Sequence, residues 1–320
     1  MGADMTSKVL VLGAQGYVGR RVAAALAASE WAQPVAAGRR AGAGVDIVVD
    51  ATDSEALAQA FAQADAVVNC MAGSPAAIVE NAKALRLALQ RVPVRLVHFS
   101  SMAIYGAIEG LIDESCLPAG GVGGYSAAKA QAEQELARTA DKVLLRPGCI
   151  YGPGSPQWTD RIAALVRARR IGDLGERGDG CSNLVHVDDV VQAVLAALRL
   201  PGTVNAVYNL AMRDAPDWND YFLAVARELG AVPLTRIGNR RLKIETHLAA
   251  PALKILEILA RRAKLRMALP PPIPPSLARL WGQDIRLDSR AAERDLGLLP
   301  WRSLQEGLRD SLPQPAGARP

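Results

Sequence analysis

Short apolar segments alternate with alanine- and leucine-rich helical segments through the first half of the chain. Strands are expected at Lys8–Leu12, Pro34–Ala37, Ile47–Val49, Ala66–Cys70, Arg95–Ser100 and Lys142–Arg146. Helices are expected between them at Tyr17–Ala28, Ser54–Gln63, Ala76–Leu89 and Tyr125–Arg138. The strand segments are apolar throughout, which is typical of a parallel sheet covered by helices on both faces. The sequence therefore predicts an α/β fold.

The second half of the chain is less regular. Gly- and Pro-rich loops at 147–157 and 172–182 flank a predicted helix at Asp160–Arg170, and a helix at Val187–Leu198 precedes a returning strand at Val207–Leu210. A length of 320 residues suggests two units. We expect residues 1–150, with 184–210 and 286–290 returning to them, to form the first unit. Residues 151–183 and 211–320 are expected to form a smaller lobe.

Composition excludes several classes of protein. Half of the residues are apolar, but no uncharged stretch is longer than 14 residues, which is too short for a membrane-spanning helix. The four cysteines form no CxxC pair and the three histidines lie far apart, so neither a disulfide scaffold nor a metal site is expected. These features predict a cytoplasmic protein without a metal.

The net charge of +5 arises from one segment. Residues 236–266 hold nine Lys or Arg residues against two Glu residues, a local charge of +7 that leaves about −2 for the rest. The segment has no interleaved aromatic residues, so no nucleic acid is expected. Within 252–267, an apolar stripe opposes a charged face. The stripe consists of Ala252, Ile255, Leu259, Ala263 and Met267, and the charged face of Lys254, Glu257, Arg261 and Lys264.

The amphipathic segment 252–267 has two interpretations. The first, which we favour, is a helix of the lobe with its apolar stripe in the core. The second is a basic amphipathic helix that contacts an anionic membrane surface or covers an apolar substrate entrance.

A glycine-rich segment follows the first predicted strand and opens the first predicted helix. It reads Gly13-Ala14-Gln15-Gly16-Tyr17-Val18-Gly19. In a strand–turn–helix unit these glycines allow a tight turn, close approach of the backbone to a pyrophosphate, and close packing of helix on strand. The βαβ context favours this over a purely structural turn. We therefore expect a Rossmann-like, doubly wound parallel sheet that binds a dinucleotide within 1–150, with a smaller, mostly helical C-terminal substrate lobe.

The end of the second predicted strand distinguishes NAD from NADP. An NAD site commonly has Asp or Glu there to bind the ribose 2′-hydroxyl, but this chain has Gly38-Arg39-Arg40 and no acid before Asp46. A guanidinium group suits a 2′-phosphate. We therefore predict NADP(H) as the cofactor; NAD is the alternative if Arg39 and Arg40 are only solvated surface residues.

Tyr125 and Lys129 stand four residues apart in a predicted helix, which places both side chains on one face. A neighbouring ammonium group lowers the pKa of a phenol, so Tyr125 is expected to act as an acid or base near neutral pH. Ser101, just after the predicted strand Arg95–Ser100, is expected to hydrogen-bond a substrate oxygen. Its alternative role is to fix the turn.

These features occur in order with two others. The five motifs are Gly13-x-x-Gly16-x-x-Gly19, Ser100–Gly106, Tyr125-x-x-x-Lys129, Arg146–Gly154 and His186–Asp189. Together they resemble the extended short-chain dehydrogenase/reductase family, also named the NAD-dependent epimerase/dehydratase family. The resemblance covers residues 8–210 and returns at Leu287–Ser289 and Asp295–Trp301.

The resemblance implies a role for each matching residue. Tyr125 is expected to donate or accept the proton, Lys129 to hold the nicotinamide ribose, and Ser101 to polarise the substrate oxygen. Asn81 matches a structural or proton-relay position. The domain junction is expected to be organised by His186, Asp188 and Asp189. The residues expected to contact the cofactor are Gly13, Gln15, Gly16, Tyr17, Val18, Gly19, Arg39, Arg40, Asp50, Ala51, Cys70, Met71, Ala72, Ser100, Tyr125, Lys129, Pro147, Gly148 and Ile150.

Three functions stay open. The first is a net oxidoreductase that transfers a hydride between NADP(H) and a carbonyl or secondary alcohol of a small organic substrate. The second is a nucleotide-sugar epimerase or dehydratase with tightly held NAD. The third is a non-catalytic NADP(H)-binding sensor or scaffold, which the retained Ser101, Tyr125 and Lys129 disfavour. A homodimer through the helices at 76–89 and 125–138 is the habit of the family and is expected only by analogy.

The sequence of the lobe does not identify the substrate. Nucleotide-sugar enzymes of the family usually carry an arginine before the strand that leads to the His186 motif, but this chain has Cys181–Val185 there. Candidate substitutes are Arg177, Arg236 and Arg286. Trp158, Trp218 and Trp281 either line a pocket or fill the core.

Overall fold

The fold is described by a computed structural model that covers residues 6–119, 124–262 and 270–313. Its centre is a seven-stranded parallel sheet in the order β10-β7-β5-β4-β1-β2-β3. The strands are β1 (Ser7–Leu12), β2 (Ala32–Gly38), β3 (Ile47–Val48), β4 (Ala66–Asn69), β5 (Arg95–Phe99), β7 (Lys142–Pro147) and β10 (Asn205–Leu210). The predicted Rossmann-like, doubly wound sheet is confirmed, and the expected strand bounds are right to within two residues.

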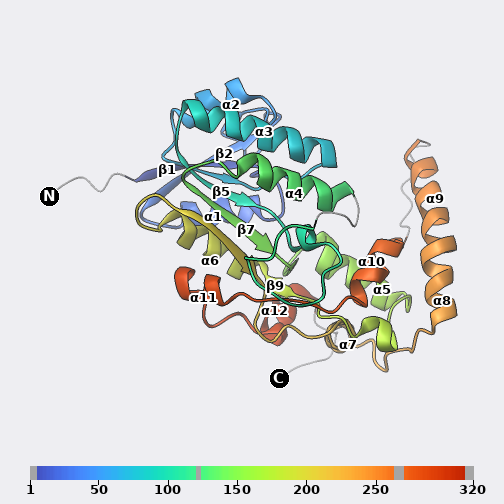
Figure 1. Ribbon diagram of the computed structural model, residues 1–320. Helices are drawn as coiled ribbons and strands as arrows, with labels where there is room; N and C mark the ends of the chain where they lie inside the picture. The colour runs from blue at the N-terminus through green and yellow to red at the C-terminus, as the bar shows by residue number, and fades with distance from the viewer. Residues whose placement is uncertain (1–5, 120–123, 263–269, 314–320) are drawn as a thin grey trace.

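Helices cover both faces of this sheet (Figure 1). One layer consists of α2 (Ser54–Phe61), α3 (Pro75–Arg91) and α4 (Gly124–Leu136), and the other of α1 (Gly19–Ala27), α6 (Val187–Leu198) and α11 (Arg290–Leu296). Val9 and Val11 of β1 pack in the core with α1 and α6, whereas Leu10 and Leu12 pack with α2 and α3. All four are at most 1% exposed, which explains why the strand is apolar at every position.

Two small sheets tie distant segments to the site end of the main sheet. β8 (Cys149–Tyr151) pairs with β9 (Leu184–His186), after which α6 leads to β10 beside β7. β6 (Gly110–Ile112) pairs with β11 (Ile285–Leu287), so the loop after β5 contacts the C-terminal part of the chain. Residues 286–290 thus approach the first half of the chain through β6. The division into 1–150 and a lobe stays a proposal.

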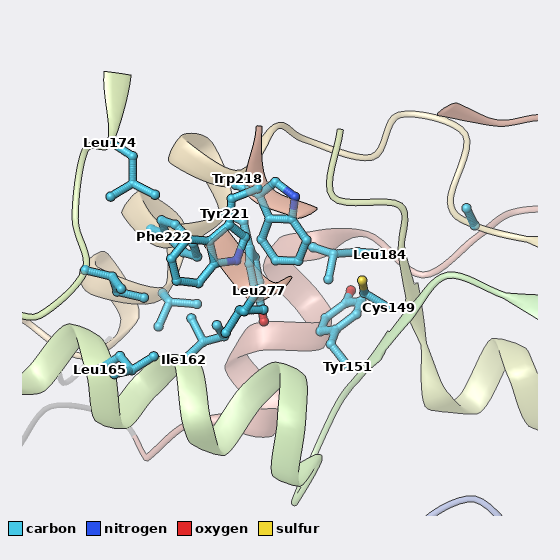
Figure 2. Packing of buried hydrophobic residues seen from close by; sticks show 14 of the residues in the cluster. Cys149, Tyr151, Ile162, Leu165, Leu174, Leu184, Trp218, Tyr221, Phe222 and Leu277 are labelled. Atoms are coloured by element: carbon cyan, nitrogen blue, oxygen red, sulfur yellow. The ribbon is translucent and has the colours of Figure 1, made fainter. Parts of the chain in front are cut away.

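The C-terminal region is mostly helical, as expected. It contains α5 (Arg161–Arg167, preceded by a π-helical turn at Pro156–Asp160), α7 (Trp218–Glu228), α10 (Pro275–Trp281) and α12 (Leu304–Ser311). Its core is aromatic: the ring centroids of Trp218 lie 6.5 Å from Trp281 and 5.9 Å from Phe222, and Figure 2 shows Trp218, Tyr221 and Phe222 gathered together. Trp218 and Trp281 are fully buried and fill the core.

A long helical rod follows α7. It consists of α8 (Asn239–Ile244), a π-helical turn (Glu245–Ala249) and α9 (Ala250–Arg262). The expected stripe at 263–267 lies outside the described residues. For Ile255 and Leu259 the favoured core position is wrong, because these side chains are 59% and 54% exposed. Among the residues that the structure describes, no helix is long and apolar enough to cross a membrane.

Candidate active site

A cavity of about 750 Å³ lies at the carboxyl ends of the central strands. Because parallel strands end at the same edge, the segments after β1, β4, β5 and β7 meet there. Twelve of the predicted site residues line it: Tyr17, Val18, Cys70, Met71, Ala72, Ser100, Ser101, Tyr125, Lys129, Pro147, Gly148 and Ile150. Residues predicted from motifs more than 130 positions apart therefore share one site.

The glycine loop connects β1 to α1 beside this cavity, and its geometry fits a dinucleotide. Gly13 has φ +75°, and a Cβ there would lie 2.9 Å from the carbonyl oxygen of Cys70. A Cβ on Gly19 would lie 2.2 Å from the carbonyl oxygen of Gly13, so the helix packs directly on the turn. A Cβ on Gly16 would meet only that same oxygen, at 3.1 Å. Gly16 therefore leaves open space at the start of α1, where a phosphate would bind.

The other predicted cofactor residues lie at the ends of β2 and β3, outside the cavity lining. Gln15 reaches toward the end of β2, with its Oε1 3.5 Å from where a Cβ of Gly38 would stand. Arg39 and Arg40 follow Gly38 and are exposed. Asp50 accepts hydrogen bonds from the backbone and hydroxyl of Thr52, which together with the charge of Arg39 lower the pKa of its carboxyl. This end of the site is open to solvent.

Asn81 links the segment after β3 to the end of β4. Its amide donates to the carbonyl oxygen of Ala51 at 2.7 Å, and its Oδ1 accepts from Asn69 at 2.7 Å. The Asn69 amide also lies 2.9 Å from Nδ1 of His98. Burial lowers the pKa of His98 to about 3, so the ring is neutral. These contacts favour the structural role predicted for Asn81 over the proton-relay role.

Ser101 and Tyr125 meet where the chain leaves β5. Ser101 caps a 3-10 helix, Met102–Tyr105, by accepting from the backbone N–H of Ala103 at 3.2 Å. Ser126 donates to the carbonyl oxygen of Ala103 at 2.5 Å, which holds the start of α4 against the same turn. Tyr125 is thereby placed at the cavity, 47% exposed, in a hydrogen bond with Ser101. Ser101 thus both fixes the turn and faces the site.

Lys129 lies deeper in the cavity. Its ammonium group donates to the carbonyl oxygen of Phe99 at 2.6 Å and is only 4% exposed. Burial lowers the pKa of Lys129 to about 8, while the negative charge of Glu133 acts in the opposite direction. The expected lowering of the Tyr125 pKa by Lys129 is not found. Burial raises the pKa of Tyr125, and the hydrogen bond with Ser101 opposes that rise.

Two lining residues, Tyr17 and Ser100, carry a buried hydroxyl group without a hydrogen-bond partner among the described residues. An orphaned hydroxyl in a cavity normally binds water or a ligand. Together with the glycine loop, these hydroxyl groups indicate that the residues present fit a bound dinucleotide.

The His186 motif lies at the junction behind the cavity. His186 accepts from the backbone N–H of Asp188 through Nδ1 at 3.2 Å and so caps α6. Burial lowers the pKa of His186 to about 4 and raises that of Asp189 to about 6. Asp188 pairs with Arg302 at 3.0 Å, and Asp189 accepts from the Arg302 backbone. These contacts hold the segment before α12.

Apart from Trp158, which the sequence offered as a possible pocket residue, the remaining cavity wall was missed from the sequence. It comes from the 3-10 helix after β5, two proline-containing segments, α10 and β11, and is mostly apolar: Met102, Pro156, Trp158, Pro274, Leu277, Leu280 and Ile285. Trp158 therefore lines the cavity and also contacts the aromatic core, with its ring centroid 5.4 Å from that of Trp218. The Pro270–Pro275 run was the only local signal that the chain turns here.

The arginines near the cavity differ from those expected. Arg177, Arg236 and Arg286 bind Asn239, Asp173 and Asp284, and none lines the cavity. Arg279 of α10 lies in the lining and is exposed. Among the described residues, no Asp or Glu lines the cavity. The lining around Ser101 and Tyr125 is therefore mostly apolar, and Arg279 adds positive charge on one side.

Known proteins share this architecture. The UDP-glucuronic acid 4-epimerase of Bacillus cereus, in complex with UDP-glucuronic acid and NAD, superposes with a TM-score of 0.70 at 16% identity, covering 95% of this chain and 97% of that one. The 3-diazoavenalumate denitrifying reductase of a Streptomyces species is 30% identical over 256 residues, 71% of this chain and 83% of that protein. The 3beta-hydroxysteroid-dehydrogenase/decarboxylase isoform 2 of Arabidopsis thaliana is 24% identical over 234 residues.

The comparisons differ in how much of each protein they cover, and a family model gives the assignment. The chain spans only 41% of the length of the Arabidopsis protein, although 68% of this chain is matched. The sequence model of the NAD dependent epimerase/dehydratase family matches residues 9–211, more than half of the chain. The match includes β1 to β10 and every predicted catalytic residue. The chain therefore belongs to the NAD dependent epimerase/dehydratase family and is an NAD(P)-dependent enzyme.

Proposed function

We propose that this enzyme is an NADP(H)-dependent reductase of a carbonyl group in a small, largely apolar organic substrate. The observation that carries the proposal is the cavity itself. Ser101 and Tyr125 face one part of it, and the wall beyond them is formed by side chains such as Trp158, Leu277 and Leu280. An apolar wall binds an apolar substrate body and excludes water from the reacting carbonyl.

The cavity gives less support to a nucleotide sugar. A sugar diphosphate carries at least two negative charges and many hydroxyl groups, which require several charged or polar partners. Apart from Lys129, the only cation in the described lining is Arg279. Arg279 keeps the nucleotide-sugar epimerase as the second candidate. One exposed guanidinium is better suited to a single carboxylate on an otherwise apolar substrate.

The side chains suit proton donation to a carbonyl oxygen. When bound, the nicotinamide ring supplies the hydride. Tyr125 donates its phenolic proton to the carbonyl oxygen, which gives an alcohol, and Ser101 donates a hydrogen bond to the same oxygen. Burial raises the pKa of Tyr125 above its ordinary value, so the phenol keeps the proton that donation to a carbonyl oxygen requires. Lys129, which donates to the carbonyl oxygen of Phe99, would bind the ribose.

The preference for NADP(H) rests on Arg39 and Arg40. Both side chains are exposed just beyond β2, where a ribose 2′-phosphate would lie. Hydrogen bonds to charged groups contribute about 1.5–3 kcal/mol each, so Arg39→Ala with Arg40→Ala should weaken NADPH binding by at least tenfold. NADH binding should change little. Arg138→Ala with Arg227→Ala removes two exposed charges elsewhere and is the control.

The first test is to denature freshly purified protein and to quantify the nicotinamide nucleotide released per chain. The reductase should release little and should bind NADPH much more tightly than NADH. Near-stoichiometric, non-exchanging NAD⁺ would instead mean that the hydride is returned in each cycle, which contradicts the proposal and favours an epimerase or dehydratase.

The second test is a screen of apolar aldehydes and ketones with NADPH, followed by Tyr125→Phe. The variant should lose about 10²–10⁴-fold in kcat while binding NADPH with unchanged affinity. Retained turnover would assign proton donation to another group. Tight NADPH binding by the wild type, without turnover of any carbonyl, would favour the sensor or scaffold.

A further inference from the structure

The rod formed by α8, the π-helical turn and α9 carries an apolar stripe on its outer face. In Figure 1 the rod stands at the edge of the molecule, with α10 between it and the rest of the chain. Ile244, Leu248, Ile255 and Leu259 are 54–67% exposed. They recur at helical spacing, so they form one stripe along the rod. Isolated exposed apolar residues are ordinary, but a continuous stripe marks an interaction surface.

The opposite face of the rod already has its partner. Leu242, Thr246, Ala250 and Ala260 are buried, at spacings of four and ten residues. Glu245 reaches back to Arg170 in an ion pair, and Arg241 donates to the carbonyl oxygen of Arg169. The rod is therefore fixed on the protein through its inner face. Its outer stripe is not needed to hold it there.

The segment that contains the rod is strongly basic in sequence. Residues 236–266 carry nine basic and two acidic side chains. One of the two acids, Glu245, is paired with Arg170, which lies outside the segment. Arg240 and Lys243 are exposed at the start of the rod. An apolar stripe with positive charge beside it is complementary to a partner that has an apolar interior and a negatively charged surface.

We propose that this outer face docks on an anionic lipid bilayer, with Ile244, Leu248, Ile255 and Leu259 inserted at the level of the headgroups. A second copy of the chain fits less well. A two-fold contact would bring the same stripe of both copies together, and with it the exposed Arg240 and Lys243 of each copy into one interface. An anionic bilayer satisfies both the apolar stripe and the positive charge.

Docking here would place the bilayer on the side of the molecule that holds α10. The chain continues from the rod to Pro270 and into α10, which contacts the π-helical turn of the rod. Leu277 and Leu280 of α10 line the cavity. The docking surface and the apolar wall of the cavity are thus built on adjoining elements.

Vesicle co-sedimentation with the full chain tests the proposal. The wild type should bind vesicles of 70% phosphatidylcholine and 30% phosphatidylglycerol at low salt, should bind pure phosphatidylcholine weakly, and should dissociate as salt is raised. Ile255→Glu with Leu259→Glu should lower the bound fraction at least tenfold. Leu87→Glu with Leu117→Glu is the matched control, because it adds the same charges at leucines that are 40% and 82% exposed elsewhere.

A second variant separates the charge from the stripe. Arg240→Glu with Lys243→Glu leaves every apolar residue of the stripe in place and should also reduce binding to anionic vesicles. Thermal unfolding confirms that each variant is folded. No binding by the wild type at low salt would overturn the proposal, as would equal loss in the Leu87 and Leu117 control. Light scattering that shows a dimer broken by the Ile255 and Leu259 changes, without vesicle binding, would assign the face to self-association instead.

Discussion

Gly16→Ala and Gly19→Ala separate the two functions of the glycine loop. Both substitutions add one methyl group, three residues apart, to the same turn. At Gly19 the new Cβ would lie 2.2 Å from the carbonyl oxygen of Gly13 and 2.9 Å from its carbonyl carbon. At Gly16 it would meet only that oxygen, at 3.1 Å. The two variants should therefore fail in different ways.

The expected magnitudes follow from these distances. Ordinary contact begins at 3.4 Å, so Gly19→Ala requires a shift of about 1.2 Å between the backbone of the turn and the start of α1. Overpacking of this kind costs about 1–3 kcal/mol when side chains can move, and both partners here are backbone, so we expect a loss of about 3 kcal/mol or more. Gly16→Ala requires only about 0.3 Å, and the unfolding free energy should change by less than about 1 kcal/mol.

For dinucleotide binding the order of the two variants should be reversed. Relative to the stability that each variant loses, Gly16→Ala should lose more affinity than Gly19→Ala. The Cβ of Gly16→Ala would occupy the open space at the N-terminus of α1, where the pyrophosphate would bind. We expect NADPH affinity to fall at least tenfold while the fold is kept. Urea unfolding gives the stabilities and fluorescence titration with NADPH gives the affinities. Gly238→Ala is the control, because a Cβ there would meet nothing within 4 Å.

Two results would refute the reasoning. If Gly16→Ala binds NADPH as tightly as the wild type, the open space beside Gly16 does not hold the phosphates. If Gly16→Ala loses as much stability as Gly19→Ala, the loop relaxes in a way that the fixed backbone distances do not describe. Unchanged stability in Gly19→Ala would also mean that the loop relaxes in a way that these distances do not describe.

Three further predictions concern the lobe and the junction. Arg279→Gln should raise KM at least tenfold for carbonyl substrates that carry a carboxylate and leave KM for uncharged ones unchanged, as steady-state kinetics can measure. Trp218→Ala should lower the unfolding free energy by about 3–5 kcal/mol in urea titrations, because the ring is fully buried among aromatic partners. The pKa of Asp189 is raised from 3.8 to about 6, so its carboxyl favours folding at low pH and that contribution disappears as the pH rises through 6. Asp189→Asn should therefore gain stability relative to the wild type between pH 4 and 7, and a constant difference in thermal unfolding would contradict this.

The sheet and the cofactor end of the site could be predicted because their signals are local. Parallel strands buried on both faces have to be apolar throughout, so β1, β4, β5 and β7 could be placed within two residues. The segments after β1 and β5 then bring Tyr17 and Ser101 to the same cavity. The raised pKa of Tyr125 could not be predicted in this way, because it follows from the burial of the side chain.

The substrate wall could not be predicted because its residues meet only through long-range contacts. Asn183 donates to the carbonyl oxygen of Ile285 at 2.7 Å and accepts from the N–H of Leu287 at 2.8 Å. These bonds, with the β6–β11 pairing, bring α10 over the end of the main sheet. No periodicity in the sequence records such a contact. Arg279 and Leu280 therefore look like ordinary helix residues until contacts such as those of Asn183 bring them to the cavity that Tyr125 also lines. The substrate specificity that we propose would depend on hydrogen bonds between segments about 100 residues apart.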